Sequence, residues 1–238
     1  MLSTPQNSPP VSDLGIRHDS VRQRISAAAT AADRDVRSIT LLAVTKGQDV
    51  ARIRAAMALG LTEFGENYVE EALPKIGALH GSAAQWHFIG RLQANKTRAV
   101  AGSFSWVHSV DRLRVAERLS AQRSPQLPQL NVCVQVRVAD DPAKGGVEQD
   151  AVLPLLQGIA TLPHLRLRGL MCMLPDEMAE AGQHRAFAGL RDLLETARSS
   201  GIALDTLSMG MSADMEAAIV EGATIVRVGT ALFGSRAA

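Results

Sequence analysis

Lys46 is the residue of this 238-residue sequence whose type and position best suit covalent chemistry. It lies two residues after the mostly apolar run 39–44, which has the pattern of a buried strand. A lysine at the end of such a strand is partly desolvated, and desolvation favours the neutral amine that attacks carbonyl groups and forms Schiff bases. The position alone equally allows a lysine that extends into solvent. The chain has four lysines, so any lysine chemistry must use Lys46, Lys75, Lys96 or Lys144.

Two later segments combine small residues with hydroxyl groups at expected strand-to-helix turns. They consist of Ser208, Met209, Gly210, Met211 and Ser212 in the first segment, and of Gly229 and Thr230 in the second. Backbone N–H groups at such turns converge on an anion, and the dipole of the following helix favours the negative charge. Both segments therefore favour phosphate binding, and the alternative is ordinary helix capping by Ser212 or Thr230.

A reactive lysine beside a phosphate site indicates a ligand with both an aldehyde and a phosphate. Pyridoxal 5′-phosphate (PLP) and the sugar phosphates of class I aldolases both meet this description. Asn67 could bind the ring hydroxyl of such a ligand or cap a helix, and Arg227 could face a ring nitrogen or pair with a carboxylate. His87 lies inside an apolar strand pattern, which is more typical of a core histidine than of a ligand-binding one.

Strand-like and helix-like patterns alternate along the chain and must position these residues. The expected strands are 39–44, 62–65, 85–89, 104–110, 130–138, 165–171, 204–209 and 223–228. Strict alternation calls for a parallel sheet covered by helices, and eight such units in about 200 residues predict an α/β fold, a single (β/α)8 TIM-type barrel. An open doubly wound sheet is the alternative. In a barrel, Lys46 on the first strand and the two segments after the last strands become neighbours at one end.

The two ends of the sequence differ from the repeating pattern. An amphipathic helix is expected over 14–34, and no helix is expected after the last strand. We therefore expect the N-terminal helix to pack across the closure of the ring. Residues 1–13, rich in proline and serine, are expected to form a flexible tail, and 14–238 a single TIM-type barrel domain that carries the candidate site.

The composition excludes several classes of protein. Lys+Arg is 25 and Asp+Glu is 24, so the net charge of +1 offers no basic excess for nucleic acid. Cys133 and Cys172 lack the spacing of a disulfide scaffold or zinc ribbon and fit a reducing cytoplasm. No apolar run approaches the ~18 residues that span a membrane, and the first residues lack the features of a signal peptide. We expect a cytoplasmic protein without metal.

One motif imitates a nucleotide-binding loop. Residues 90–97, GRLQANKT, follow an expected strand and nearly match the P-loop pattern, with Lys96 at the lysine position. Asn95 replaces the second glycine, where the backbone must approach phosphate closely. Asp140, after a later strand, could imitate the magnesium-binding partner. Because Asn95 stands at the second glycine position, nucleotide hydrolysis is disfavoured.

Seven stretches carry a resemblance to a known family. They are AVTKGQ at 43–48, FGENYVEEALPK at 64–75, WHFIGRLQANKTR at 86–98, WVHSVDR at 106–112, QVRVADDPAKGGV at 135–147, RGLMCM at 168–173 and LSMGMSADMEAAIVEGATIVRVGTALFG at 207–234. Through them the chain resembles the pyridoxal phosphate homeostasis protein family, which is related to the N-terminal barrel of alanine racemase. It departs from common family residues at Thr45, Arg91 and Arg137, and Arg137 puts the region around Lys144 in question.

The resemblance implies a role for each candidate residue. Lys46 matches the lysine that carries PLP as an internal aldimine, and Asn67 matches an asparagine near the cofactor. Residues 208–212 and 229–230 match the phosphate-binding segments, and Arg227 matches an arginine that faces the pyridine nitrogen. An arginine at that position weakens the electron sink of the cofactor.

The resemblance also implies a function in intracellular vitamin B6 homeostasis. We expect a non-enzymatic, monomeric protein that holds PLP on Lys46 and delivers it to PLP-dependent apoenzymes. The alternative is a low-activity amino-acid racemase with Tyr68 or a nearby histidine as second base, although the second domain that supplies a tyrosine in alanine racemases is not expected here. Aldolase or P-loop chemistry would instead leave the protein without PLP. Whether Lys96 or Lys144 forms a second PLP site or is a surface lysine stays open.

Overall fold

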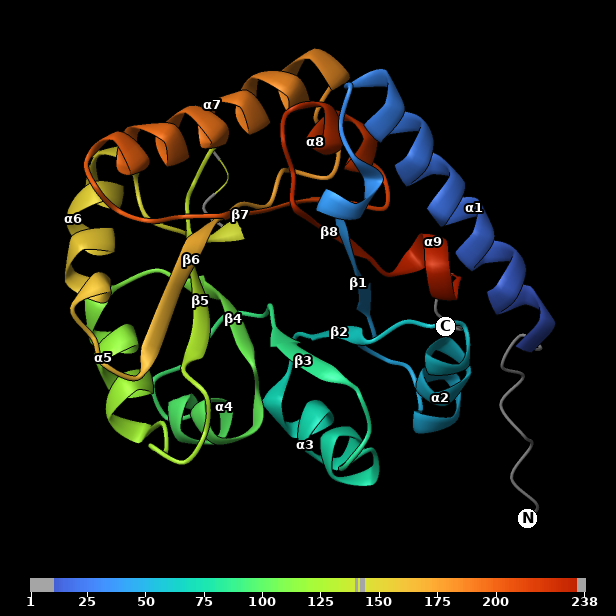
Figure 1. The fold of residues 1–238 in the computed structure, drawn as a ribbon, viewed down its shortest axis with the longest axis horizontal. Coiled ribbons are helices and arrows are strands. Elements are labelled where there is room, and N and C mark those ends of the chain that lie inside the picture. Colours follow the sequence, from blue (N-terminus) through green and yellow to red (C-terminus); the bar gives the residue numbers. More distant parts are fainter. Residues whose placement is uncertain (1–10, 140, 142–143, 235–238) are drawn as a thin grey trace.

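Eight parallel strands form a closed barrel in this computed structural model, which describes residues 11–139, 141 and 144–234. The strands are β1 Thr40–Val44, β2 Glu63–Glu66, β3 Gln85–Phe88, β4 Trp106–Val110, β5 Leu130–Gln135, β6 Leu165–Met171, β7 Thr206–Met211 and β8 Ile225–Val228. They follow one another around the ring in sequence order, and Thr40 to Ala43 on β1 pair with Ile225 to Val228 on β8 (Figure 1). The predicted (β/α)8 barrel is confirmed.

Helices cover the outside of this ring. They are α1 Val11–Ala31, α2 Val50–Ala58, α3 Val69–Ala78, α4 Thr97–Ser103, α5 Leu113–Gln122, α6 Gln149–Ala160, α7 Glu180–Ser199, α8 Met215–Val220 and α9 Thr230–Phe233, with a short 3-10 helix at Val36–Ser38. The short helix α9 after the last strand was not expected from the sequence. Among the helices in the part of the chain the structure describes, none is long and apolar enough to cross a membrane.

The N-terminal helix packs across the closure of the ring. α1 lies against α8 and α9, where β8 meets β1, and buries Leu14, Val21 and Ile25 there (Figure 1). It begins at Val11, so the last residues of the expected tail 1–13 are helical, whereas residues 1–10 lie outside the described part. It ends three residues earlier than expected because the chain turns at Asp33, whose φ is 52°.

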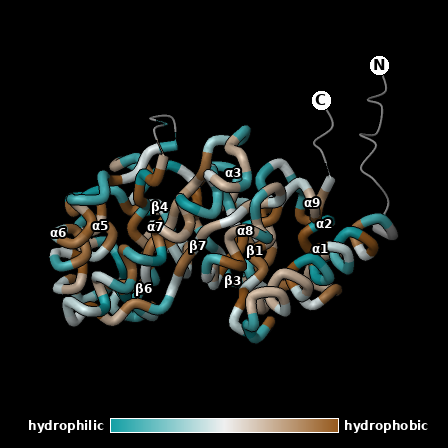
Figure 2. The backbone as a smooth tube through the Cα atoms, turned by 90° about the horizontal axis from the view of Figure 1, so that it is seen from above, coloured by the Kyte–Doolittle hydropathy of each residue, from teal (hydrophilic) through white to brown (hydrophobic). Residues whose placement is uncertain are grey.

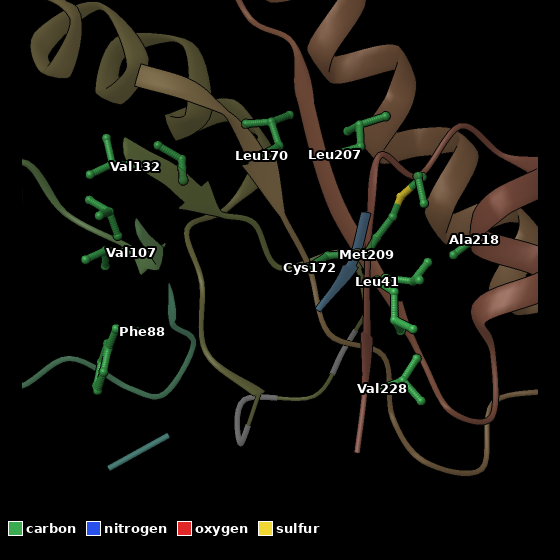
Figure 3. Close-up of a cluster of buried hydrophobic side chains, with 14 of the residues drawn as sticks. Leu41, Phe88, Val107, Val132, Leu170, Cys172, Leu207, Met209, Ala218 and Val228 are labelled. Atoms are coloured by element: carbon green, nitrogen blue, oxygen red, sulfur yellow. The ribbon is translucent and has the colours of Figure 1, made fainter. Parts of the chain in front are cut away.

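The apolar core forms two layers on either side of the strands. In the outer layer, side chains such as Leu41, Val107, Leu170 and Met209 pack between the barrel and its helices (Figure 3). The hydropathy colouring in Figure 2 agrees with this arrangement of the core. Hydrophobic segments run through interior elements such as β1 and β7, while the outer helices alternate between hydrophobic and hydrophilic residues. The inner layer is small and consists of Leu42, Val44, Ile89 and Ile225, with Trp106 packed against it.

Two strands differ from their expected ranges in ways that affect the site. β7 runs from Thr206 to Met211 rather than over 204–209, so the first phosphate-binding segment is largely strand. β5 ends at Gln135 rather than at 138, because the chain folds back there: Val147 N–H donates to Gln135 O, and the Gln135 side chain donates to Lys144 O at 2.6 Å. Asp140, the imagined magnesium ligand, lies outside the described residues.

Candidate functional site

A cavity of about 340 Å³ opens at the carboxyl ends of the strands. Seven of the ten residues predicted from the sequence line it: Lys46, Asn67, Met211, Ser212, Arg227, Gly229 and Thr230. They come from β1, β2, β7 and β8 and from the turns that follow these strands. This is where the sites of such barrels lie, and the volume is in the range that small ligands occupy.

The other three predicted residues lie beneath or behind the cavity rather than on its wall. Ser208 is fully buried inside the barrel and accepts a hydrogen bond from Arg227. Met209 points outward into the layer between strands and helices (Figure 3). Gly210 has a φ of 88°, and a Cβ there would lie 2.5 Å from the Cβ of Ala218, so only glycine suits this turn toward α8.

The turn that carries Lys46 is held on both sides by side chains of α3. Lys75 Nζ donates to the carbonyl oxygen of Thr45 at 2.8 Å, and the N–H of Gly47 donates to Glu71 Oε1 at 2.5 Å. Lys75 and Glu71 are themselves paired at 2.6 Å, one helical turn apart. The backbone before and after Lys46 is therefore fixed by one ion pair. This clamp was not predicted from the sequence, although Glu71 and Lys75 have the i, i+4 spacing of a helical ion pair.

Glu66 completes the clamp from inside the barrel. Its Oε1 accepts from Lys75 Nζ at 2.8 Å and from Thr45 Oγ1 at 2.6 Å, and the side chain is completely buried. Burial raises the pKa of the Glu66 carboxyl, while the hydrogen bonds from Lys75 and Thr45 oppose the rise. Its second oxygen, Oε2, is buried and has no hydrogen-bond partner among the residues that the structure describes.

Asn67 presents a buried acceptor beside the cavity. Its Oδ1 has no hydrogen-bond partner within the described chain. Helix capping does not account for this residue, because the N-cap of α3 is Tyr68 and no side-chain cap is formed. The Asn67 backbone is fixed by close packing, since a Cβ on Gly90 would lie 1.9 Å from the Asn67 carbonyl oxygen. Buried polar atoms are normally satisfied, so a donor on a ligand, such as a hydroxyl, fits here.

The turns after β7 and β8 meet at the other side of the cavity. The N–H of Ala231, in the first turn of α9, donates to Ser212 Oγ at 3.2 Å, which ties the two turns together. Gly229 lies against β1, where a Cβ would be in ordinary van der Waals contact with the Cβ of Val44, at 3.4 Å. Asp214 also lines the cavity and was not singled out from the sequence; its Oδ1 accepts the N–H of Met211. The capping alternative fails for Thr230, because the N-cap residue of α9 is Gly229, whereas Ser212 does satisfy a first-turn N–H of α9 through its hydroxyl oxygen.

Arg227 lies at the floor of the cavity and is almost completely buried. Its guanidinium donates to the carbonyl oxygens of Ser208, at 2.6 Å, and Cys172, at 2.7 Å, and to Ser208 Oγ at 2.9 Å. Burial lowers the pKa of Arg227 from its ordinary value. The alternative in which it pairs with a carboxylate is not seen among the ion pairs of the described residues. A buried arginine that is held by carbonyl groups is a fixed hydrogen-bond donor for the cavity.

The remaining sequence candidates do not line the cavity, although Lys144 pairs with Asp176, which does. Tyr68 is 62% exposed, Lys96 pairs with Glu70 on the surface, and Lys144 pairs with Asp176 at 2.9 Å. His87 is a buried, hydrogen-bonded core histidine, as its strand pattern indicates. In the described part of the chain, no group of three or more His, Cys, Asp or Glu side chains could hold a metal ion.

Comparisons with known proteins agree with the barrel fold and show the family of the chain. Residues 16–237 match the family model described as "Alanine racemase, N-terminal domain". A Pseudomonas aeruginosa protein named "Pyridoxal phosphate homeostasis protein" is 54% identical over 217 residues, which are 91% of this chain and 93% of that protein. An Escherichia coli K12 protein of the same name is 46% identical over 226 residues, covering 91% of this chain and 94% of that one.

Solved structures extend the comparison to three dimensions. PipY of Synechococcus elongatus, in a structure described as having PLP bound, superposes with a TM-score of 0.80 at 35% identity and covers 90% of this chain and 100% of PipY. Alanine racemase from Corynebacterium glutamicum has a TM-score of 0.67 at 15% identity and covers 92% of this chain and 62% of the racemase. The second likeness concerns the fold alone.

Proposed function

The chain belongs to the alanine racemase N-terminal domain family and, within it, to the pyridoxal phosphate homeostasis proteins, and from this membership we propose that it binds PLP and serves PLP homeostasis without catalysing a reaction. The observation that carries the proposal is that Lys46, Asn67 and Arg227 line one cavity together with the turns after β7 and β8. PLP supplies an aldehyde, a ring hydroxyl, a ring nitrogen and a phosphate. The cavity offers an amine, an unsatisfied amide oxygen, a buried guanidinium and two hydroxyl-bearing turns to match them.

Each group of the chain has one role in this proposal. Lys46 Nζ condenses with the aldehyde to form a Schiff base, and the aldehyde oxygen leaves as water. Asn67 Oδ1 accepts from the ring hydroxyl, and Arg227 donates toward the ring nitrogen and disfavours its protonation. Ser212 and Thr230, with the backbone of their turns, bind the phosphate. The clamp on both sides of Lys46 fixes the backbone from which its side chain reaches the cavity.

The residues around the cavity support binding of PLP rather than catalysis with PLP. The described residues on its wall include no histidine, the side chain that most often transfers protons in catalysis, and no tyrosine or cysteine. Tyr68, the second base of the racemase alternative, does not line the cavity and is largely exposed. A PLP enzyme needs an acid or base near the substrate carbon, and the wall offers no such group except Lys46 and two aspartates, Asp176 and Asp214.

The proposal includes the assembly and location of the protein. Its exposed large apolar side chains, among them Ile16, Tyr68, Leu113 and Val220, come from different helices or helix starts. Such scattered residues are ordinary for a monomer, and we propose a monomeric cytoplasmic protein that passes PLP to apoenzymes. Light scattering during gel filtration measures the mass, and a coupled assay with a PLP-dependent apoenzyme measures the transfer.

The absorption spectrum of the purified protein tests PLP binding. We expect a visible band that borohydride abolishes, with the reduced label on the peptide that contains Lys46. Lys46→Arg should remove the band, and Lys144→Arg is the matched control that should keep it. A label on Lys96 or Lys144 would show that PLP binds elsewhere. A wild-type protein without a band after addition of PLP would refute the proposal, and exchange of an amino-acid α-proton would refute its non-enzymatic part.

A further inference from the structure

A chain of polar side chains crosses the barrel interior below the cavity. Glu63 Oε2 lies 2.6 Å from His87 Nε2, and His87 Nδ1 lies 2.9 Å from His108 Nε2. His108 Nδ1 lies 2.7 Å from Ser208 Oγ, which accepts from Arg227 Nη1 at 2.9 Å. The five residues come from β2, β3, β4, β7 and β8, so the chain spans the width of the barrel.

The burial of this chain is nearly complete between its two ends. His87, His108, Ser208 and Arg227 are each at most 3% exposed. The side chain of Glu63 is 28% exposed and belongs to the first residue of β2, at the end of the barrel opposite the cavity. Buried polar groups are costly unless they are hydrogen-bonded, and here every ring nitrogen has a partner. The network therefore gives a low-dielectric path from a solvent-reached carboxylate to the cavity floor.

The hydrogen atoms of the chain have one consistent arrangement. An ionised carboxylate only accepts, so His87 Nε2 carries the proton that is donated to Glu63. A neutral imidazole has one donor and one acceptor, so His87 Nδ1 accepts from His108 Nε2, and His108 Nδ1 accepts from the Ser208 hydroxyl. The lone pairs of that hydroxyl then accept from Arg227, as observed. Burial lowers the pKa of both histidines, that of His108 well below its usual value, which keeps both rings neutral.

Neighbouring groups fix the ring planes. The rings of His87 and Trp106 are stacked, with centroids 5.3 Å apart and planes at 7°. The guanidinium of Arg168 lies over the Trp106 ring, 4.6 Å from its centroid. The His87 ring is therefore fixed by stacking as well as by its two hydrogen bonds.

We propose that Glu63, His87, His108 and Ser208 are positioning residues that orient the Arg227 guanidinium toward the cofactor ring through a single, directed chain of hydrogen bonds. The orienting role rests on the proposed binding of PLP. The donor-to-acceptor direction of the hydrogen bonds from Ser208 to Glu63 does not depend on it. Two backbone carbonyl groups also hold Arg227, so the chain adjusts the orientation of the guanidinium and does not by itself keep it in place. No member of the chain other than Arg227 lines the cavity.

The direction of the chain is tested without cofactor. Imidazole ¹⁵N NMR of the PLP-free protein should show His87 and His108 as neutral rings protonated on Nε2. Glu63→Gln removes the obligatory acceptor and should give a mixture of tautomers at both rings. Glu117→Gln, at an exposed glutamate of α5, is the matched control and should leave both rings unchanged. A proton on Nδ1 of either ring in the unaltered protein would overturn the proposed direction.

The orienting role is tested with PLP bound. His108→Phe should shift the visible absorption band and release PLP about tenfold faster, the lower range for losing a hydrogen bond that bears on a charged group. His108→Gln keeps a donor and an acceptor and should restore most of the difference. Glu63→Gln, at a partly exposed residue, should show the same band shift in smaller measure, and it serves if His108→Phe does not fold. Absence of PLP uptake by the unaltered protein would refute the proposed function, whereas normal uptake with unmoved bands and release rates in the variants would refute only the orienting role.

Discussion

Lys75→Met removes the cation that stabilises a completely buried carboxylate. Glu66 then keeps the hydrogen bond from Thr45 and loses its ion pair, while Glu71, which is partly exposed, is rehydrated. Breaking a buried ion pair by removing one partner costs about 3–5 kcal/mol. Glu66 can instead take up a proton, which costs less free energy than keeping an unpaired buried carboxylate. Protonating a carboxyl of ordinary pKa costs about 4 kcal/mol at pH 7 and about 1 kcal/mol at pH 5.

The loss of stability should therefore depend on pH. In the variant the pKa of Glu66 is higher in the folded protein than in the unfolded chain, because the carboxyl is buried. Between these two pKa values the folded protein binds more protons than the unfolded chain. The stability of the variant therefore falls as the pH rises through this range. We expect a loss of about 3–4 kcal/mol at pH 7 that shrinks toward about 1 kcal/mol at pH 5. Urea unfolding of the PLP-free protein, followed by tryptophan fluorescence at both pH values, measures it.

Two further variants make the measurement specific. Glu66→Gln in the Lys75→Met background removes the stranded charge and should restore most of the stability at pH 7. Lys96→Met breaks only the surface pair with Glu70 and should leave the unfolding midpoint nearly unchanged at both pH values. A loss for Lys75→Met that is the same at pH 5 and pH 7 would refute the assignment of the cost to the Glu66 carboxylate.

Three other predictions follow from buried groups and close contacts. Burial holds the pKa of His108 well below its usual value, so the unfolded chain binds the proton first and stability should be lost as the pH falls below about 6.5; His108→Gln should reduce that slope in urea titrations. Burial raises the pKa of Cys133 and of Cys172 to about 12, so neither should react with a thiol reagent at about pH 8 until the protein is unfolded. Gly90→Ala would place a Cβ 1.9 Å from a backbone carbonyl oxygen and should destabilise the protein strongly, whereas Gly189→Ala, in α7 with nothing within 4 Å, should raise the unfolding free energy by up to about 1 kcal/mol.

The barrel was predictable because its evidence is local. Each strand is an apolar run followed by a helical pattern, and eight repeats leave little choice of topology. The ends of strands were less predictable: β7 continues to Met211, because Gly210 takes a positive φ that keeps the residue beyond it in the ladder. The same local evidence placed Ser212 and Thr230 at the candidate site, and both line the cavity, while phosphate binding by their turns stays a prediction.

The supports of the site were not predictable from local pattern. Lys75 reaches the carbonyl oxygen of Thr45, 30 residues earlier, and His108 reaches Ser208, 100 residues later. No local sequence pattern predicts either contact, because both contacts exist only after the barrel has closed. His87 illustrates the limit: its strand pattern correctly indicates a core histidine, but that pattern contains nothing about its partners, and the partners are what give the residue a role.

The arrangement of these supports bears on the choice between carrier and enzyme. Lys75 and Glu71 hold the backbone on both sides of Lys46, and the hydrogen-bonded chain that ends at Ser208 contacts Arg227. Both supports therefore act on residues that line the cavity. Groups that are equally complementary before and during a reaction tighten binding without lowering a barrier. Turnover would also need a free acid or base on the cavity wall, and the two aspartates there are engaged, Asp176 by Lys144 and Asp214 by the N–H of Met211. We therefore interpret these supports as ones that hold a bound cofactor, in keeping with the proposed function in PLP homeostasis.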